Sequence, residues 1–308
     1  MAKKGKIPAS NARMRKGTKN QNRAQVKKKA SKQALPSSFS VLGDALKLLK
    51  ANWRSLVGIM LIYLILNIVF ASGLSGVINN FSIVKENLAA DNSFSNALSG
   101  LGSLLGSGAS GDSQSGSALQ SVLLVIGSLA IIWALRQLLA KKEFSVKDAY
   151  YKSMFPLVPF LLVIFVIIIQ LLPITLGSAI VALISSTLAS SGTATFIMAL
   201  ALVPLFAWSV YMLSSSVFAL YIVTLPDMQP RQALRSAKRL VEFRRLKVIR
   251  RLLFLPLFIL LAMAVIVLPL ILFIDLLVIP VFYLLSILVL LVAHAYLYNL
   301  YRGLLDAK

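Results

Sequence analysis

The chain reads TLPDMQPRQALRSAKRLVEFRRLKVIRRLL over residues 224–253, and this stretch decides the fold. Its basic residues and its small or aliphatic residues recur with helical spacing, which indicates a short amphipathic helix. Long apolar runs lie on both sides of the stretch. This arrangement is typical of a helix that lies along a membrane surface between two spanning helices.

The composition supports a membrane protein. The chain has 308 residues, of which 58% are hydrophobic, and its formal net charge is +22. These two properties must be separated in space, and the charge is nearly absent from five runs, which are residues 56–78, 119–135, 156–184, 195–225 and 252–301. Each run can cross a hydrocarbon core of about 30 Å, and the last can cross it twice.

The expected fold is therefore an all-α, polytopic integral membrane protein with six transmembrane helices. A membrane barrel is excluded because its strands alternate polar and apolar residues, whereas these runs are continuously apolar. The expected spans are residues 56–78, 118–138, 157–182, 197–224, 251–273 and 278–300.

An internal repeat relates the three basic segments. Residues 39–46 read FSVLGDAL and residues 144–150 read FSVKDAY, while residues 232–234, QAL, occupy the corresponding place in the third segment. A pair of spans follows each of them. The sequence thus predicts three repeats of one unit, which is an in-plane amphipathic helix followed by a hairpin of two spans.

The short helices have recognisable starts and faces. Ser145 and Asp148 have the spacing of a capping box, and Pro230 suits the first turn of the third helix. The first helix should lie on the membrane through a stripe of Phe39, Leu42, Leu46, Leu49 and Trp53. In the third helix we expect the bilayer to be contacted by Ala233, Ala237, Leu240 and Val241.

The basic residues predict the topology. If the amino terminus is inside, the cytoplasmic segments contain 15 Lys or Arg up to Arg54, 5 in residues 136–152, 9 in residues 231–251 and 2 at the end, which is 31 of the 32. This asymmetry predicts a multi-pass protein of the bacterial cytoplasmic membrane with both termini in the cytoplasm.

Residues 1–38 form a basic segment that precedes the six-span domain of residues 39–308. The segment has twelve Lys or Arg and no acid, so it is expected to be disordered. No apolar run follows at the distance of a cleaved signal. Three interpretations stay open: contact with an acidic lipid surface, contact with nucleic acid such as ribosomal RNA, or a tail that is simply solvated.

The third basic segment is the candidate binding surface. Between residues 231 and 251 nine cations accompany a single acid, Glu242. Each cation close to an acidic leaflet contributes on the order of 1 kcal/mol. The candidate contacts to anionic lipid are Arg235, Lys238, Arg239, Arg244, Arg245 and Lys247, and the alternative is that these cations only set the topology.

Three polar side chains within the spans form a second candidate site, composed of Asn67, Gln170 and His294. For Asn67, an interhelical hydrogen bond is favoured over a ligand site. His294 lies eight residues before Arg302, about 12 Å along a helix, which favours a neutral histidine near the inner headgroups over a proton relay. Three such residues are sparse for an ion or sugar pathway.

Part of the chain resembles a known group of membrane proteins. The resemblance rests on ALYIVTLPD at residues 219–227, QALRSAKRL at 232–240 and the basic run at 244–251, together with the six-span layout. These features resemble the membrane-domain families found with glycerophosphoryl diester phosphodiesterases, and related six-span bacterial inner-membrane families. In such proteins a separate soluble barrel carries the phosphodiesterase chemistry, and since no barrel fits here that activity is not implied.

The residue inventory argues against an enzyme. Acid-base catalysis and metal sites need clustered carboxylates, histidines or cysteines, but the chain has ten acids spread singly, one histidine and no cysteine. No cofactor and no metal are therefore expected. The favoured function is a lipid-interacting or membrane-organising scaffold, with anionic membrane lipids and another membrane protein as partners. The alternative is a transporter or permease-like protein for a lipid or another amphiphile.

Overall fold

The computed structural model describes residues 36–70, 77–79, 81–82, 85–86, 104, 114–188 and 191–306, without the side chains of residues 114–117, 181–182, 184–188, 191–199 and 275. Its helices are α2 (Ser38–Ala51), α3 (Trp53–Phe70), α6 (Gln114–Leu139), α7 (Val146–Ser153), α8 (Leu157–Leu188), α9 (Ser191–Ile222), α10 (Pro230–Val241), α11 (Arg245–Phe273) and α12 (Asp275–Asp306). Six of them are long and apolar enough to cross a membrane, namely α3, α6, α8, α9, α11 and α12. The predicted all-α fold with six spanning helices is confirmed.

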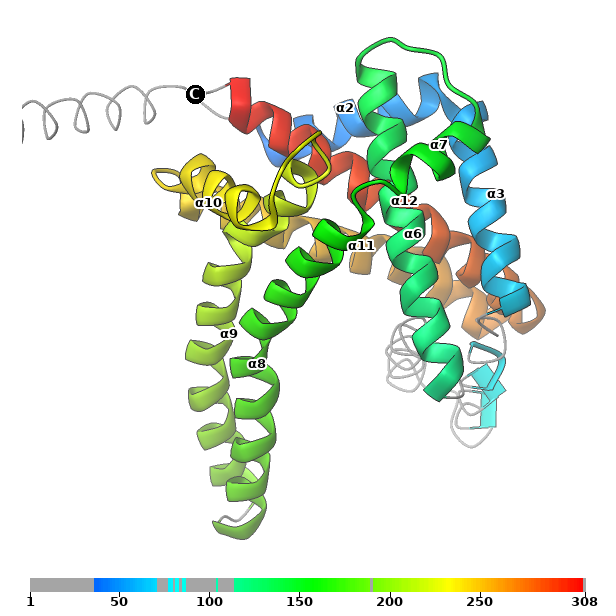
Figure 1. The fold of residues 1–308 in the computed structure, drawn as a ribbon. Coiled ribbons are helices and arrows are strands. Elements are labelled where there is room, and N and C mark those ends of the chain that lie inside the picture. Colours follow the sequence, from blue (N-terminus) through cyan, green and yellow to red (C-terminus); the bar gives the residue numbers. More distant parts are fainter. Residues whose placement is uncertain are drawn as a thin grey trace, which may run out of the picture.

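The helices follow one another as three repeats. Each of the short helices α2, α7 and α10 precedes two long ones, which gives the units α2–α3–α6, α7–α8–α9 and α10–α11–α12. Figure 1 places the three short helices at the same end of the molecule, where the chain also ends after α12. In that view they lie across the direction in which α3, α6, α8 and α9 run. The repeat that the sequence predicted is present in the fold.

The N-terminal caps form where the sequence predicts them. Ser145 Oγ accepts a hydrogen bond of 3.2 Å from the backbone N–H of Asp148 and donates one of 3.1 Å to the Asp148 carboxylate. The same capping contact starts α2, where Ser37 Oγ accepts from the N–H of Ser40. Pro230 is the first residue of α10, a position whose N–H needs no helical partner.

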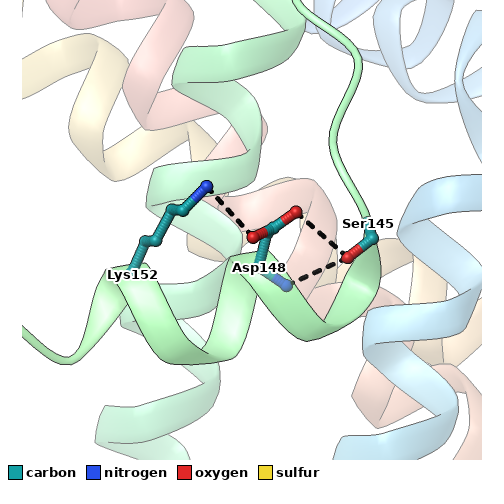
Figure 2. A network of polar contacts seen from close by, with 3 residues as sticks. All are labelled: Ser145, Asp148 and Lys152. Carbon is teal, nitrogen blue, oxygen red and sulfur yellow. Dashed lines mark hydrogen bonds and ion pairs between the residues drawn. The ribbon is translucent and has the colours of Figure 1, made fainter.

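Figure 2 shows that the α7 cap continues into an ion pair. The Asp148 carboxylate lies 3.0 Å from Lys152 Nζ, one helical turn further along α7. The hydrogen bond from Lys152, followed by the one from Ser145, lowers the pKa of Asp148 below its ordinary value. The carboxylate is therefore ionised at every physiological pH and keeps its negative charge at the positive end of the helix dipole.

Close packing fixes α7 against α3. A Cβ added at Gly58 would lie 2.7 Å from Val146 Cγ2, so α3 needs glycine where α7 crosses it. Tyr150 on α7 donates a hydrogen bond of 2.9 Å to the backbone carbonyl of Ile59 on α3. Burial, with a smaller effect from Tyr63, raises the pKa of Tyr150 to about 12, so the phenol keeps the proton that it donates.

The core lies around α12. This helix contacts α2, α3, α6, α9, α10 and α11, so it touches all three repeats. Its side chains Phe282, Tyr296 and Leu300 are fully buried. By contrast, α8 and α9 pack mainly against each other, and their outer faces expose large apolar side chains such as Phe165, Leu176 and Phe206. In a bilayer these faces contact lipid tails instead of water.

Several helix ends differ from the expected apolar spans. The first helix starts at Trp53 instead of residue 56, and residues 71–76 of the expected span lie outside the described part. The fifth helix starts at Arg245 instead of residue 251, and the sixth continues to Asp306 instead of residue 300. Helices extend past the apolar core because intrahelical hydrogen bonding also satisfies the backbone at the headgroup level. Of the predicted basic tail, residues 1–35 lie outside the described part.

The expected orientation of two short helices needs correction. Ala233, Ala237 and Val241 are fully buried inside the protein, so they do not face the bilayer as predicted. The reason is that α10 lies against α9, and small side chains allow this close approach. On α2, Leu42 and Leu49 of the predicted membrane stripe are buried in the protein too. The rest of that stripe is exposed, namely Phe39 and Leu46 on α2 and Trp53 at the start of α3.

Candidate functional site

The first candidate region is the solvent-accessible side of α10 and of the first turn of α11. We call it the basic face and define it by the exposed side chains of Arg235, Lys238, Arg239 and Lys247. The three on α10 are exposed because the opposite side of that helix, with its alanines, packs on α9. None of the four has an ion-pair partner among the described residues. Four exposed positive charges are therefore not neutralised by an ion pair within the described structure.

Apolar side chains are exposed directly beside the basic face. Leu246 is 83% exposed and lies between Arg245 and Lys247 in the sequence, and Phe243 is 42% exposed. Both belong to the turn that joins α10 to α11 or to the first residues of α11. Cations next to exposed apolar side chains are the pattern of a segment that inserts into the headgroup region of a membrane.

The other two predicted lipid contacts are less accessible. Arg244 is only 7% exposed, so it lies beneath the surface that the other cations form. Arg245 is half-buried, and its guanidinium lies 4.5 Å from the centre of the Tyr211 ring on α9. A cation over an aromatic face is held in place without losing its positive charge. Arg245 is therefore held in position by Tyr211, whereas the side chains of the basic face are exposed.

Arg245 opens onto a pocket of about 330 Å³ between α8, α9, α10 and the start of α11. We call it the Gln170 pocket. It brings together three residues that the sequence singled out for different reasons, which are Gln170, Lys238 and Arg245. The remaining lining residues are Val166, Tyr211, Met212, Ser215, Ser216 and Leu234.

The polar groups of the Gln170 pocket are unevenly satisfied. The side-chain oxygen of Gln170 is buried and has no hydrogen-bond partner in the described structure. The hydroxyls of Ser215 and Ser216 donate to the backbone carbonyl of Met212, at 3.1 Å and 3.4 Å. Both serine hydroxyls thus donate their proton within the protein, and toward a ligand they can act only as hydrogen-bond acceptors.

His294 lies in an interhelical network instead of at an open interface. Its Nδ1 is 3.1 Å from Tyr221 Oη on α9, and its Nε2 is 3.0 Å from Ser128 Oγ on α6. A neutral imidazole has one N–H and one lone pair, so it donates one of these bonds and accepts the other. The second long helix of each repeat contributes one member, and the network ties the three repeats together.

Asn67 makes the interhelical hydrogen bond that the sequence favoured. Tyr283 on α12 donates a bond of 2.8 Å to Asn67 Oδ1, and Asn67 Nδ2 donates one of 3.4 Å to Tyr63 Oη in its own helix. These groups line a cavity of about 250 Å³ together with Gln120 and Ser286. Asn67, Gln170 and His294 therefore have separate partners, and the structure does not bring the three into one path.

Sequence reasoning missed a larger pocket, of about 550 Å³, between α6, the α7–α8 junction and the α9–α10 connection. We call it the Arg136 pocket. Arg136 donates to the carbonyl of Thr224 at 2.7 Å and also to the Thr224 hydroxyl. Lys152, which lines the same pocket, is paired with Asp148 and lies 6.0 Å from the centre of the Trp133 ring. The residues that line the Arg136 pocket are far apart in the sequence, and no sequence motif includes them together.

Among the described residues, no group of three His, Asp or Glu side chains lies close enough together to hold a metal ion.

Comparisons with known proteins add no relative. No family model matches the chain, and neither the curated proteins nor the solved structures contain a match to it. The resemblance to the membrane domains found with glycerophosphoryl diester phosphodiesterases therefore stays a prediction.

Proposed function

We propose that this polytopic membrane protein is a lipid-binding scaffold that recruits anionic phospholipids to its cytoplasmic side. The basic face is the observation that supports this function most directly. Its four exposed cations lack ion-pair partners among the described residues, and exposed Leu246 and Phe243 lie beside them. A surface of this kind matches an acidic leaflet both in charge and in its capacity to insert apolar side chains.

The proposed orientation puts the basic face in the cytoplasm. The short helices α2, α7 and α10 lie at one end of the molecule, and 31 of the 32 Lys and Arg belong to the segments that the charge pattern assigns to that side. Positive residues are retained on the cytoplasmic side during membrane insertion. The cytoplasmic leaflet also has the negative surface potential that such cations would bind.

A scaffold is favoured over an enzyme or a polar transport pathway. The single histidine has hydrogen-bond partners on both nitrogens, and Asn67 is bonded to two tyrosines. Polar side chains that are satisfied by neighbouring helices stabilise a bundle and are not available to a passing solute. The alternative, a transporter for a lipid or another amphiphile, needs a continuous path, and Asn67, Gln170 and His294 line no common pocket among the described residues.

Native mass spectrometry at low salt tests this function. The purified protein should retain phosphatidylglycerol or cardiolipin in preference to phosphatidylcholine. The triple variant R235Q/R239Q/K247Q removes three cations that would contribute about 1 kcal/mol each before screening, so anionic-lipid retention should fall roughly 10- to 100-fold.

The variant K141Q/K142Q/R302Q is the matched control, because it removes three exposed cations from the same end of the molecule but outside the basic face. Its retention of anionic lipid should stay near that of the unmodified protein. Equal retention of anionic and zwitterionic lipids by the unmodified protein would refute the proposed function.

A further inference from the structure

We infer that the Gln170 pocket is a headgroup site for one class of ligand, an anionic phospholipid whose headgroup also has a free hydroxyl. This inference rests on the proposed function and assigns it a defined site. The basic face attracts acidic lipids through exposed charges, whereas the pocket holds one headgroup by directional contacts. The two share Lys238, but Gln170 and Arg245 belong to the pocket alone, and Arg235, Arg239 and Lys247 to the basic face alone. Substitutions at these unshared residues test the two parts separately.

The charge of the pocket calls for an anion. Lys238 and Arg245 both line it, and no acidic side chain does. Neither cation has an ion-pair partner among the described residues. Two like charges in a recess are unfavourable together, and a phosphate between them relieves the repulsion and accepts charge-assisted hydrogen bonds. The ring of Tyr211 holds Arg245 in position for this contact.

The uncharged groups call for a hydrogen-bond donor on the ligand. The Gln170 side-chain oxygen is buried without a partner, which is costly for an acceptor within an apolar bundle. Ser215 and Ser216 have already given their protons to Met212, so they too present acceptors. A ligand hydroxyl can satisfy these oxygens, whereas a phosphate oxygen cannot. The pocket therefore has donors for a phosphate and acceptors for a hydroxyl.

The surroundings of the pocket favour a lipid over a water-soluble phosphate ester. Its apolar lining comes from Val166, Met212 and Leu234, and the next residues on α8 expose Ile168 and Ile169. Those exposed side chains belong to a helix that is long and apolar enough to span the membrane. A volume of about 330 Å³ lies in the range of small-ligand pockets and suits a headgroup, while acyl chains would continue along the outer face of α8.

The larger Arg136 pocket is a weaker candidate for the same ligand. Arg136 already donates to Thr224, and Lys152 is paired with Asp148. Asp227 adds a negative charge to the lining. An incoming phosphate would have to displace existing partners there, whereas in the Gln170 pocket it would supply missing ones.

The test compares phosphatidylglycerol with phosphatidylmethanol, which has the same charge but no free hydroxyl, by native mass spectrometry of the full chain. The unmodified protein should retain phosphatidylglycerol several-fold better than phosphatidylmethanol. The variant Q170L should lose this preference and keep its retention of both anionic lipids over phosphatidylcholine. The variant K238Q/R245Q should lose retention of both anionic lipids about tenfold, and K141Q/K142Q, which removes as many charges elsewhere, should not.

Several outcomes would overturn the inference. One is equal retention of the two anionic lipids by the unmodified protein, and another is an unchanged preference in Q170L. Since K238Q/R245Q could disturb packing against Tyr211, R245K serves as a second variant that keeps the charge and should keep most of the binding. Displacement of the lipid by free glycerol phosphate at equal concentration would identify a site for a soluble ester and contradict the lipid assignment.

The result also separates the pocket from the proposed function. If R235Q/R239Q/K247Q reduces anionic-lipid retention but K238Q/R245Q does not, the pocket inference fails and the basic face remains the lipid-binding element. If the unmodified protein shows no preference for anionic lipid, both fail.

Discussion

At the scale of single residues, His294 illustrates how a polar group in a membrane helix can be structural. An ionisable residue inside a span is a functional candidate by default. Here the ring is held between Ser128 on α6 and Tyr221 on α9, and Tyr221 itself stacks on Tyr301 of α12. Both nitrogens are therefore occupied by the protein, which favours a role in joining the repeats.

Replacement of His294 by leucine tests this role. H294L keeps a similar volume but removes two interhelical hydrogen bonds, which are worth about 0.6 to 1.7 kcal/mol each in membrane proteins. The free energy of unfolding in a detergent titration, followed by tryptophan fluorescence, should fall by roughly 1 to 3 kcal/mol. Anionic-lipid retention should not change. A variant of normal stability that lost lipid retention would instead place His294 in a functional site.

The residues of the Gln170 pocket could be named from the sequence but not grouped. In the sequence Gln170 is a polar residue within a span, and Lys238 and Arg245 are members of a basic run. Their meeting depends on α10 folding back across α8 and α9, a tertiary contact that periodicity cannot predict. The contact of Tyr211 with Arg245 could not be predicted from the sequence, because aromatic residues near the membrane interface are common in spanning helices.

At the scale of elements, the short helices show which sequence signals are reliable. Helix starts are set locally, and both the Ser145 cap of α7 and Pro230 in the first turn of α10 appear as predicted. The direction of an apolar face is not local, because in a membrane another helix and the lipid tails are equally apolar partners. Ala233 and Ala237 are small and four residues apart, which is the spacing of close helix contacts and was the available signal for burial against α9.

Substitutions on opposite sides of α10 test its orientation. Ala237 is fully buried and Ser236 is exposed, so the two neighbours form a matched pair. A237L should overpack the contact with α9 and lower the free energy of unfolding by about 1 to 3 kcal/mol. S236L should change it by less than about 0.5 kcal/mol. The reverse ranking, again measured by detergent titration, would mean that the alanines face lipid.

At the scale of the whole molecule, the three repeats meet at α12, the last helix of the third repeat. The sequence predicted the number of spans and the repeat because both depend on long apolar runs and on a recurring motif. It did not predict that α12 would contact every repeat, or that α8 and α9 would pack mainly on each other. Those features depend on interhelical contacts such as Tyr283 with Asn67, between residues 216 positions apart.

The orientation of the whole molecule yields the last prediction. The chain has no cysteine, so single introduced cysteines report their side of the membrane without background. In intact cells an impermeant thiol reagent should label cysteines at Ser107, between α3 and α6, and at Ser190, between α8 and α9. It should not label cysteines at Ser31 or Ser236, since the charge pattern predicts that the basic segments stay inside. Permeabilised cells, in which all four should react, supply the control. Labelling of Ser236 but not of Ser190 in intact cells would invert the topology, and would move the basic face away from the acidic leaflet that the proposed function requires.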